Sequence, residues 1–163
     1  MRHRRKLVSG LVALVALAAA TYLKRQPPPP ERPRASAQRL CVRVIDGDTI
    51  ELDGGERVRL IGVDTPETVD PRRPVQYFGK EASAFTRRMA QGKQVRLEFG
   101  DESRDRYGRT LAYVYLADGT FLNAEIIRQG YGHAYTRFPF RYQEEFLALE
   151  RQARAQGRGL WGR

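Results

Sequence analysis

The chain has very few of the residues that cross-link small proteins or bind soft metals. It contains one cysteine, Cys41, and two histidines, His3 and His133, among 163 residues. One cysteine excludes an internal disulfide framework, and two histidines so far apart argue against a structural zinc site. Any metal ion that the protein binds is therefore expected to have oxygen ligands. We expect Cys41, which stands among apolar strand residues, to be a small buried side chain.

A strong excess of positive charge is also missing from most of the chain, although the formal net charge is +10. Residues 1–37 hold eight of the 29 basic residues but only one of the 19 acidic residues. The remainder carries 21 basic against 18 acidic residues. This near balance argues against binding of nucleic acid through bulk charge, and the recurring apolar residues argue against disorder.

The N-terminal segment has the composition of a targeting sequence. Seventeen residues without charge, Leu7 to Leu23, follow a basic cluster and precede Lys24 and Arg25. We therefore predict that residues 1–25 are a signal peptide or a membrane anchor and that residues 26–38 are a Pro-rich linker. The small residues in this segment suit cleavage by a signal peptidase, whereas the length of the uncharged run approaches that of a membrane span. The protein is expected outside the bacterial cytoplasm, either anchored in the inner membrane and facing outward or secreted or periplasmic.

The body, residues 39–163, is predicted to be one α+β domain. Apolar residues alternate, with turn residues between them, in five segments, which are expected to be strands: 40–45, 49–52, 57–63, 93–99 and 110–116. Apolar residues at spacings of three and four predict helices at 79–91, 123–129 and 141–155, the second with Asn123 as its N-cap. Five short strands are too few for a sandwich but enough for a closed five-stranded barrel.

Two short segments place carboxylates beside predicted strand ends. Asp46-Gly47-Asp48-Thr49 puts acidic side chains on a tight turn, although Asp-Gly is also a common hairpin signal. Asp64-Thr65-Pro66-Glu67 follows an apolar strand, and Pro66 ends the strand pairing there. An ordinary solvated loop would also contain such charges. If Arg59 and Asp64 serve one site, the strand between them must bend, and we expect the bend at Gly62.

A third segment, residues 104–110, lies between the last two predicted strands. It alternates basic residues with an aromatic one, as Arg104-Asp105-Arg106-Tyr107-Gly108-Arg109-Thr110. Such a loop suits a phosphate and a neighbouring base or sugar, although charged turns with glycine are common.

Together the three segments resemble the thermonuclease-like family, the homologues of staphylococcal nuclease. Its patterns Asp-Gly-Asp-Thr, Arg-x5-Thr-Pro-Glu and Tyr-Gly-Arg all occur here in that order, and the resemblance covers about residues 40–161. It implies an OB-fold barrel of five strands with three helices. It also implies a Ca²⁺-dependent nuclease that hydrolyses DNA and RNA. A barrel that binds single-stranded nucleic acid at the cell envelope without cleaving it is the alternative.

The resemblance also implies roles for individual residues. The Ca²⁺ ligands would be Asp48, Asp64 and the carbonyl of Thr65, and Glu67 would position or activate the attacking water. The phosphate would be held by Arg59 and Arg109. The nucleotide would be contacted by Arg106, Tyr107 and Tyr135. Arg137 stands where well-known members have a second tyrosine, which predicts weaker stacking on a base. No protein partner is implied, and a monomer is expected.

Overall fold

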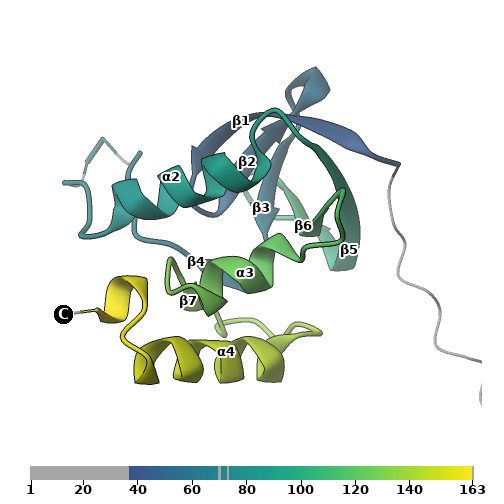
Figure 1. The fold of residues 1–163 in the computed structure, drawn as a ribbon. Helices are drawn as coiled ribbons and strands as arrows, with labels where there is room; N and C mark the ends of the chain where they lie inside the picture. The colour runs from purple at the N-terminus through teal and green to yellow at the C-terminus, as the bar shows by residue number, and fades with distance from the viewer. Residues whose placement is uncertain (1–36, 70, 73, 163) are drawn as a thin grey trace, which may run out of the picture. The chain divides into compact units, whose positions relative to one another are not determined.

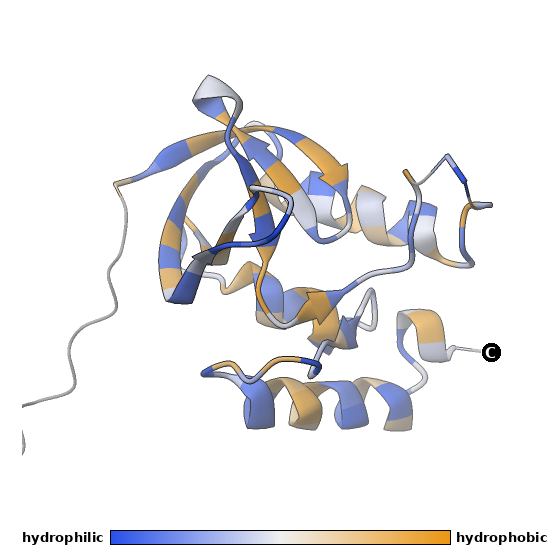
Figure 2. Ribbon diagram, turned by 180° about the vertical axis from the view of Figure 1, so that it is seen from behind, coloured by the Kyte–Doolittle hydropathy of each residue, from blue (hydrophilic) through white to orange (hydrophobic). Residues whose placement is uncertain are grey.

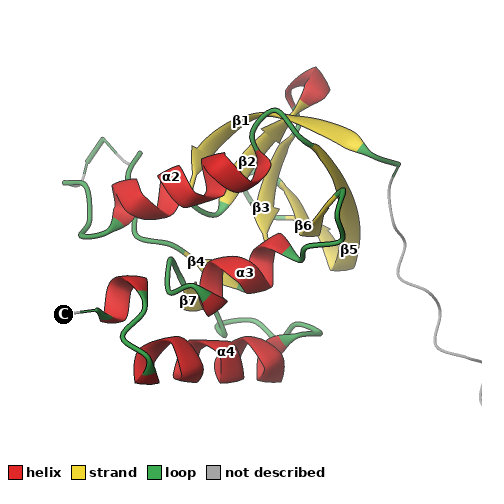
Figure 3. Cartoon of the chain, viewed as in Figure 1, coloured by secondary structure: helices red, strands yellow, loops and turns green. Residues whose placement is uncertain are grey.

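Five main strands and three α-helices form the described part of the molecule, which comprises residues 37–69, 71–72 and 74–162 of a computed structural model (Figure 1). The strands are β1 (Arg39–Asp46), β2 (Thr49–Leu52), β3 (Arg57–Leu60), β5 (Gln94–Arg104) and β6 (Thr110–Leu116), with the short β4 (Val63–Asp64) and β7 (His133–Ala134). The helices are α2 (Gly79–Ala90), α3 (Leu122–Arg128) and α4 (Gln143–Ala155), with 3₁₀ turns at Asp53–Gly55 and Gly159–Trp161. The predicted five strands and three helices are confirmed (Figure 3).

The five main strands form one coiled sheet. β1, β2 and β3 are an antiparallel meander, and β6 pairs in parallel with β3 and antiparallel with β5. β1 also pairs with β5, at Arg39–Val95 and Leu40–Gln94, so the pairings run in a circle. Only two residue pairs form this last seam, in contrast to the long β5–β6 ladder.

The hydrophobic core fills the inside of the coiled sheet and the layer beneath α3. Buried residues recur along the strands between more exposed ones. The ribbon correspondingly shows alternating hydrophobic and hydrophilic residues (Figure 2). The largest side chains that are fully buried include Tyr113, Phe146, Ile50 and Leu97. Cys41 is also fully buried, as predicted. The core therefore fixes the strand ends from which the polar motifs project.

Helix α3 contacts both the sheet and α4 (Figure 1). The predicted N-cap role of Asn123 is wrong, because α3 begins at Leu122 and Phe121 is the capping position. Asn123 lies inside the helix, fully buried, and its side chain accepts a hydrogen bond from Val114 N and donates to the carbonyls of Ile61 and Ala112. These bonds satisfy backbone groups at the end of the sheet, so the amide serves tertiary packing.

The predicted strand over 57–63 is interrupted at Gly62. β3 ends at Leu60, and β4 resumes at Val63 and pairs with β7 instead of continuing along the sheet. Gly62 has a positive φ of 73°, and a Cβ there would lie 2.5 Å from the ring of Phe140. The expected bend at Gly62 is therefore confirmed, and it turns the acidic segment toward the open end of the sheet.

The predicted targeting segment, residues 1–25, and most of the predicted linker, 26–38, lie outside the described residues. Within residues 37–162, apart from the two positions not described, no helix is long and apolar enough to cross a membrane. Export and anchoring therefore remain predictions.

Candidate active site

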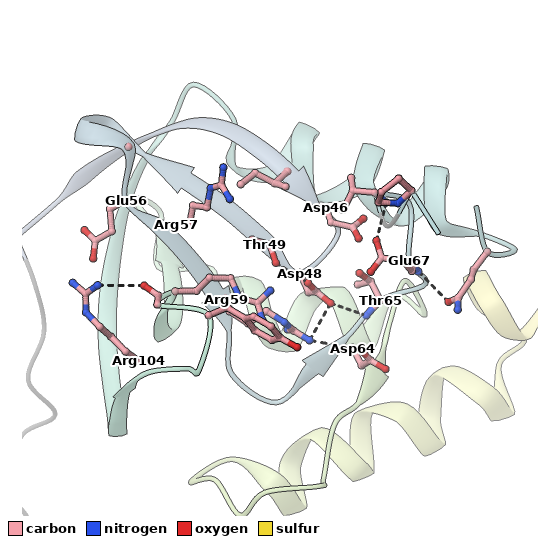
Figure 4. A pocket seen from close by; sticks show the side chains of 18 of the residues that line it. Asp46, Asp48, Thr49, Glu56, Arg57, Arg59, Asp64, Thr65, Glu67 and Arg104 are labelled. Atoms are coloured by element: carbon pink, nitrogen blue, oxygen red, sulfur yellow. Dashed lines mark hydrogen bonds and ion pairs between the residues drawn. The ribbon is translucent and has the colours of Figure 1, made fainter. Parts of the chain in front are cut away.

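One open pocket of about 1280 Å³ brings together the three polar segments that the sequence singled out (Figure 4). Seven of the nine predicted site residues line it: Asp48, Arg59, Asp64, Thr65, Glu67, Tyr107 and Arg109. The segments come from the β1–β2 turn, the β3–β4 bend with its following loop, and the β5–β6 connection. Predicted site residues up to 61 positions apart in sequence, Asp48 and Arg109, thus share one cavity.

Asp48 is fixed by the tight β1–β2 turn. Asp46 pairs with Thr49, so the turn itself consists of Gly47 and Asp48. The Asp48 side chain is buried, and its two oxygens accept hydrogen bonds from the Thr49 hydroxyl (2.9 Å) and from Thr65 N (3.1 Å). A Cβ at Gly47 would lie 2.6 Å from Thr65 Oγ1. Only glycine therefore allows the turn and the Thr65 strand to approach this closely.

Asp46, on the other side of the turn, supports the loop that follows β4. Its Oδ1 accepts hydrogen bonds from Gly47 N (2.8 Å), from the Thr68 hydroxyl (2.7 Å) and from the Ser83 hydroxyl (2.8 Å). Ser83 belongs to α2, so one buried carboxylate links the turn, the loop and the helix. Asp46 also lines the pocket.

Arg59 and Asp64 meet because the chain bends between them. Arg59 Nη2 lies 3.1 Å from Asp48 Oδ2 and 3.6 Å from Asp64 Oδ1, and its Nη1 donates to the carbonyls of Leu60 and Val63. Because Asp48 Oδ2 and Asp64 Oδ1 both contact the same nitrogen of Arg59, the two carboxylates lie close to each other. Burial raises the pKa of the Asp64 carboxyl above its ordinary value, the Asp48 carboxylate raises it further, and Arg59 offsets part of the effect.

Glu67 is held by contacts with its own loop. The Gln76 side-chain carbonyl accepts a hydrogen bond from Glu67 N (3.0 Å), and Gln76 N donates to the Glu67 carbonyl (3.0 Å). Glu67 Oε1 accepts a hydrogen bond from Val69 N (2.7 Å). The carboxylate therefore lines the pocket on a loop in which both backbone polar groups of Glu67 are hydrogen-bonded to Gln76.

The β5–β6 connection is organised around one carboxylate. Asp105 accepts hydrogen bonds from the backbone N–H groups of Tyr107 (2.9 Å) and Arg109 (3.0 Å), and Arg109 Nε donates to its other oxygen (2.7 Å). Although partial burial acts in the opposite direction, the bonds from Arg109 hold the pKa of Asp105 below its ordinary value. Arg109 Nη2 also lies 2.7 Å from Asp105 Oδ2, so two nitrogens of the guanidinium are held by Asp105 beside the pocket.

Tyr107 is the most exposed aromatic ring in this region, at 68 %. The guanidinium carbons of Arg106 and Arg109 lie 4.8 and 5.4 Å from its ring centroid, and Arg106 donates to the Tyr107 hydroxyl (2.6 Å). The ring therefore offers a flat surface at the pocket that cationic side chains hold in place.

Two predicted nucleotide contacts lie outside this pocket. Arg106 does not line it and reaches it through Tyr107. Tyr135 also does not line it: its backbone N–H donates to the Gly62 carbonyl (2.9 Å), and its ring lies 6.3 Å from that of Phe138. The pocket thus does not bring Arg106 or Tyr135 together with the other seven residues.

The predicted Ca²⁺ ligands offer hard oxygen donors that suit such an ion. No group of three or more His, Cys, Asp or Glu side chains able to hold a metal is present in the described part of the chain. The predicted set contains only two carboxylates, Asp48 and Asp64, and its third ligand is the backbone carbonyl of Thr65. Burial first and the Asp48 carboxylate second raise the pKa of Asp64, and a bound dication would offset the repulsion between these two carboxylates. The donor set therefore fits Ca²⁺.

Several pocket residues were not predicted as site residues. The side away from Asp46, Asp64 and Glu67 includes Glu56, Arg57 and Arg104. On the acidic side, Gln76 supports Glu67. Arg57 could have been found, because it lies two residues before Arg59 on a strand and so shares its face. Gln76 has no local signal, since its role depends on the path of the loop.

Carboxylates and guanidinium groups that share one pocket on a small β-barrel define a site suited to phosphate esters. The family model described as "Staphylococcal nuclease homologue" matches residues 57–163. The chain is 46 % identical over 124 residues to the thermonuclease of Staphylococcus hyicus and 48 % identical over 124 residues to that of Staphylococcus intermedius, in each case with 74 % of this chain and 73 % of the relative covered. It is also 32 % identical to endonuclease YhcR of Bacillus subtilis, over 85 % of this chain but 12 % of that protein. The chain belongs to the staphylococcal nuclease family.

Proposed function

We propose that the protein is a Ca²⁺-dependent nuclease that hydrolyses phosphodiester bonds of DNA and RNA. The observation that carries the proposal is the shared pocket in which Asp48, Asp64 and Glu67 face Arg59 and Arg109. The relatives named thermonucleases, similar over most of their length, support it.

Asp48, Asp64 and the Thr65 carbonyl would hold the calcium ion. Calcium accepts six to eight oxygen ligands, so three protein ligands leave positions for water and a phosphate oxygen. When bound, the ion supplies positive charge beside the phosphate and the attacking water. The Asp48 carboxylate is the most firmly oriented of the three ligands, because it already accepts bonds from Thr49 and Thr65.

Glu67 would orient the attacking water and accept a proton from it. A general base must reach the water by hydrogen bonding, and the Glu67 carboxylate lines the pocket. The water oxygen would form a bond to phosphorus while the bond to the leaving nucleoside oxygen breaks, and that oxygen would take up a proton from solvent. The two backbone bonds to Gln76 keep Glu67 in place during this step.

Arg59 and Arg109 would bind the scissile phosphate. Negative charge grows on the phosphate oxygens as the water attacks, and planar guanidinium groups match these oxygens with paired hydrogen bonds. Arg59 comes from the strand end and Arg109 from the β5–β6 connection. The phosphate would therefore be held from two directions.

Tyr107 would stack on a base or sugar next to the cleaved bond, with Arg106 acting through the Tyr107 hydroxyl. The family also suggests a contact with Tyr135. A contact there requires the nucleotide to extend beyond the pocket.

The deciding experiment is digestion of single- and double-stranded DNA and of RNA with Ca²⁺ and with EGTA. We expect cleavage with calcium and its loss with the chelator, since the charge of the ion would be missing. Glu67→Gln should lower kcat about 10²–10⁴-fold while urea unfolding stays near that of the wild type. The exposed Glu102→Gln is the control.

Two results would refute the proposal in different ways. Cleavage that is indifferent to EGTA would remove the calcium ion from the mechanism. Tight binding of single-stranded nucleic acid without cleavage at saturating calcium would instead identify a non-catalytic binding module.

A further inference from the structure

The pocket has two sides with different charges (Figure 4). Asp46, Asp64 and Glu67 lie on one side, and Arg57 and Arg104 lie on the other, with Arg59 between them. A site for a single phosphodiester needs only the acidic side with Arg59 and Arg109. Hydrolysis of one phosphodiester bond therefore does not explain why Arg57 and Arg104 line the other side.

Arg57 and Arg59 project from the same face of β3. Val58 and Leu60 are buried in the core, whereas the alternating Arg57 and Arg59 point outward. Two residues along a strand span about 6.6 Å. This step is similar to the distance between neighbouring phosphates of an extended single strand.

Arg104 reaches the same side from another strand. Thr110 of β6 pairs with Val58 of β3 and also with Arg104 of β5. Arg57 and Arg104 thus come from the two strands that flank β6, roughly 10 Å apart across the sheet. Arg104 Nη1 donates to the Gly108 carbonyl (3.2 Å), which holds the side chain beside the β5–β6 connection.

The guanidinium groups on this side remain accessible. The Arg57 side chain is 61 % exposed, and its ion pair with Glu51 is long, at 3.9 Å. The carboxylate of Glu56 also lines the pocket here, but it already contacts Arg39 (3.1 Å) and accepts a hydrogen bond from the Thr110 hydroxyl (2.6 Å). Its charge is therefore largely matched within the protein.

We propose that Arg57 and Arg104 form a second phosphate-binding subsite, which holds the substrate strand beyond the scissile phosphate on the side away from the carboxylates. This inference rests on the proposed nuclease function and deepens it: the enzyme selects polynucleotides over single phosphodiesters. The subsite carries no base specificity, because it contacts only the backbone of the strand.

The test assays the full-length protein, in the presence of Ca²⁺, on two substrates. One is bis(p-nitrophenyl) phosphate, a single phosphodiester, and the other is an oligothymidylate of about twelve nucleotides, within the site sizes of OB folds. Each charge-assisted contact is worth about tenfold in affinity. For Arg57→Gln/Arg104→Gln, the ratio of kcat/KM for the oligonucleotide to that for the ester should therefore fall roughly 10–100-fold.

A matched control removes two charges elsewhere. Arg43 pairs with the same Glu51 at 2.8 Å and is 58 % exposed, and Arg87 is exposed on α2, but neither lines the pocket. Arg43→Gln/Arg87→Gln should keep the ratio of the two substrates within about threefold of the wild type. A fall as large as that of the pocket variant would show that only net charge matters and would overturn the subsite.

A binding measurement with a fluorescent oligothymidylate in EGTA separates this inference from the proposed function. The slope of log K against log salt should become shallower by about 0.7 for each lost phosphate contact in the pocket variant and stay unchanged in the control. An unchanged slope in the pocket variant overturns the subsite. If the wild type cleaves neither substrate, the proposed function fails, and the salt slope still decides on the subsite.

Discussion

The acidic side of the pocket and the β5–β6 connection hold their functional groups by different means. Asp46 and Asp48 are buried, and besides local bonds they accept hydrogen bonds from other parts of the fold: Thr65 in the segment after β4, Thr68 in the next loop, and Ser83 in α2. The β5–β6 connection instead organises itself around Asp105, and its aromatic ring, Tyr107, is largely exposed. The acidic side is thus anchored to the core, whereas the connection is a local unit.

This difference suits the roles that we propose for the two parts. Like-charged carboxylates repel, so they stay close only where surrounding donors and Arg59 fix them. A group that stacks on varied bases gains from an accessible surface. We therefore expect changes in the connection to affect substrate handling and changes behind the acidic side to affect stability.

Within the β5–β6 connection, the largest effect is expected at Arg109. Arg109→Gln should lower kcat about 10²–10³-fold, because the phosphate loses a guanidinium group as its charge grows. Arg106→Gln, which removes an equal charge from the same connection but outside the pocket, should cost less than about tenfold. Single-turnover cleavage of DNA measures both, and equal losses would mean that the pocket does not distinguish the two arginines.

A smaller effect is expected at the exposed ring. Tyr107→Ala should raise KM for an oligonucleotide about tenfold with little change in kcat, because stacking on a base is lost. Tyr135→Ala should change KM less than about threefold, since Tyr135 does not line the pocket. A larger loss at Tyr135 would show that bound nucleic acid extends past Gly62.

The smallest effect is expected at Ser83, whose hydroxyl supports Asp46. Ser83→Ala removes one of three hydrogen bonds to Asp46 Oδ1 and should lower the free energy of unfolding by about 1 kcal/mol. Urea unfolding measures this change. Ser103→Ala, at an exposed serine, should stay within about 0.5 kcal/mol of the wild type. If both variants match the wild type, the Ser83 hydroxyl does not anchor Asp46.

Local patterns were sufficient to predict most of the elements. The strands at 49–52 and 110–116 have the predicted bounds, since alternation of apolar residues is unambiguous there. The bend at Gly62 also followed from a simple requirement, that Arg59 and Asp64 face one site. In contrast, β7 has only two residues, and its pairing with β4 depends on a partner about 70 positions away.

Site residues that belong to contiguous motifs could be predicted from the sequence. Residues whose contacts form only when distant segments pack together could not. Asn123 carries a common N-cap signal, but the carbonyls of Ile61 and Ala112 that it binds become neighbours only after folding. Gln76 reaches Glu67 through a loop closure that no periodicity reveals. Arg57 differs from these two, because it lies outside the motif that begins at Arg59 although it shares its strand face.

The contact between Gly47 and Thr65 has a consequence for how such a protein can change over time. The turn and the segment after β4 meet where not even a methyl group fits. An insertion in one would have to be matched by an adjustment in the other. These two stretches, 18 residues apart in the sequence, must therefore change together.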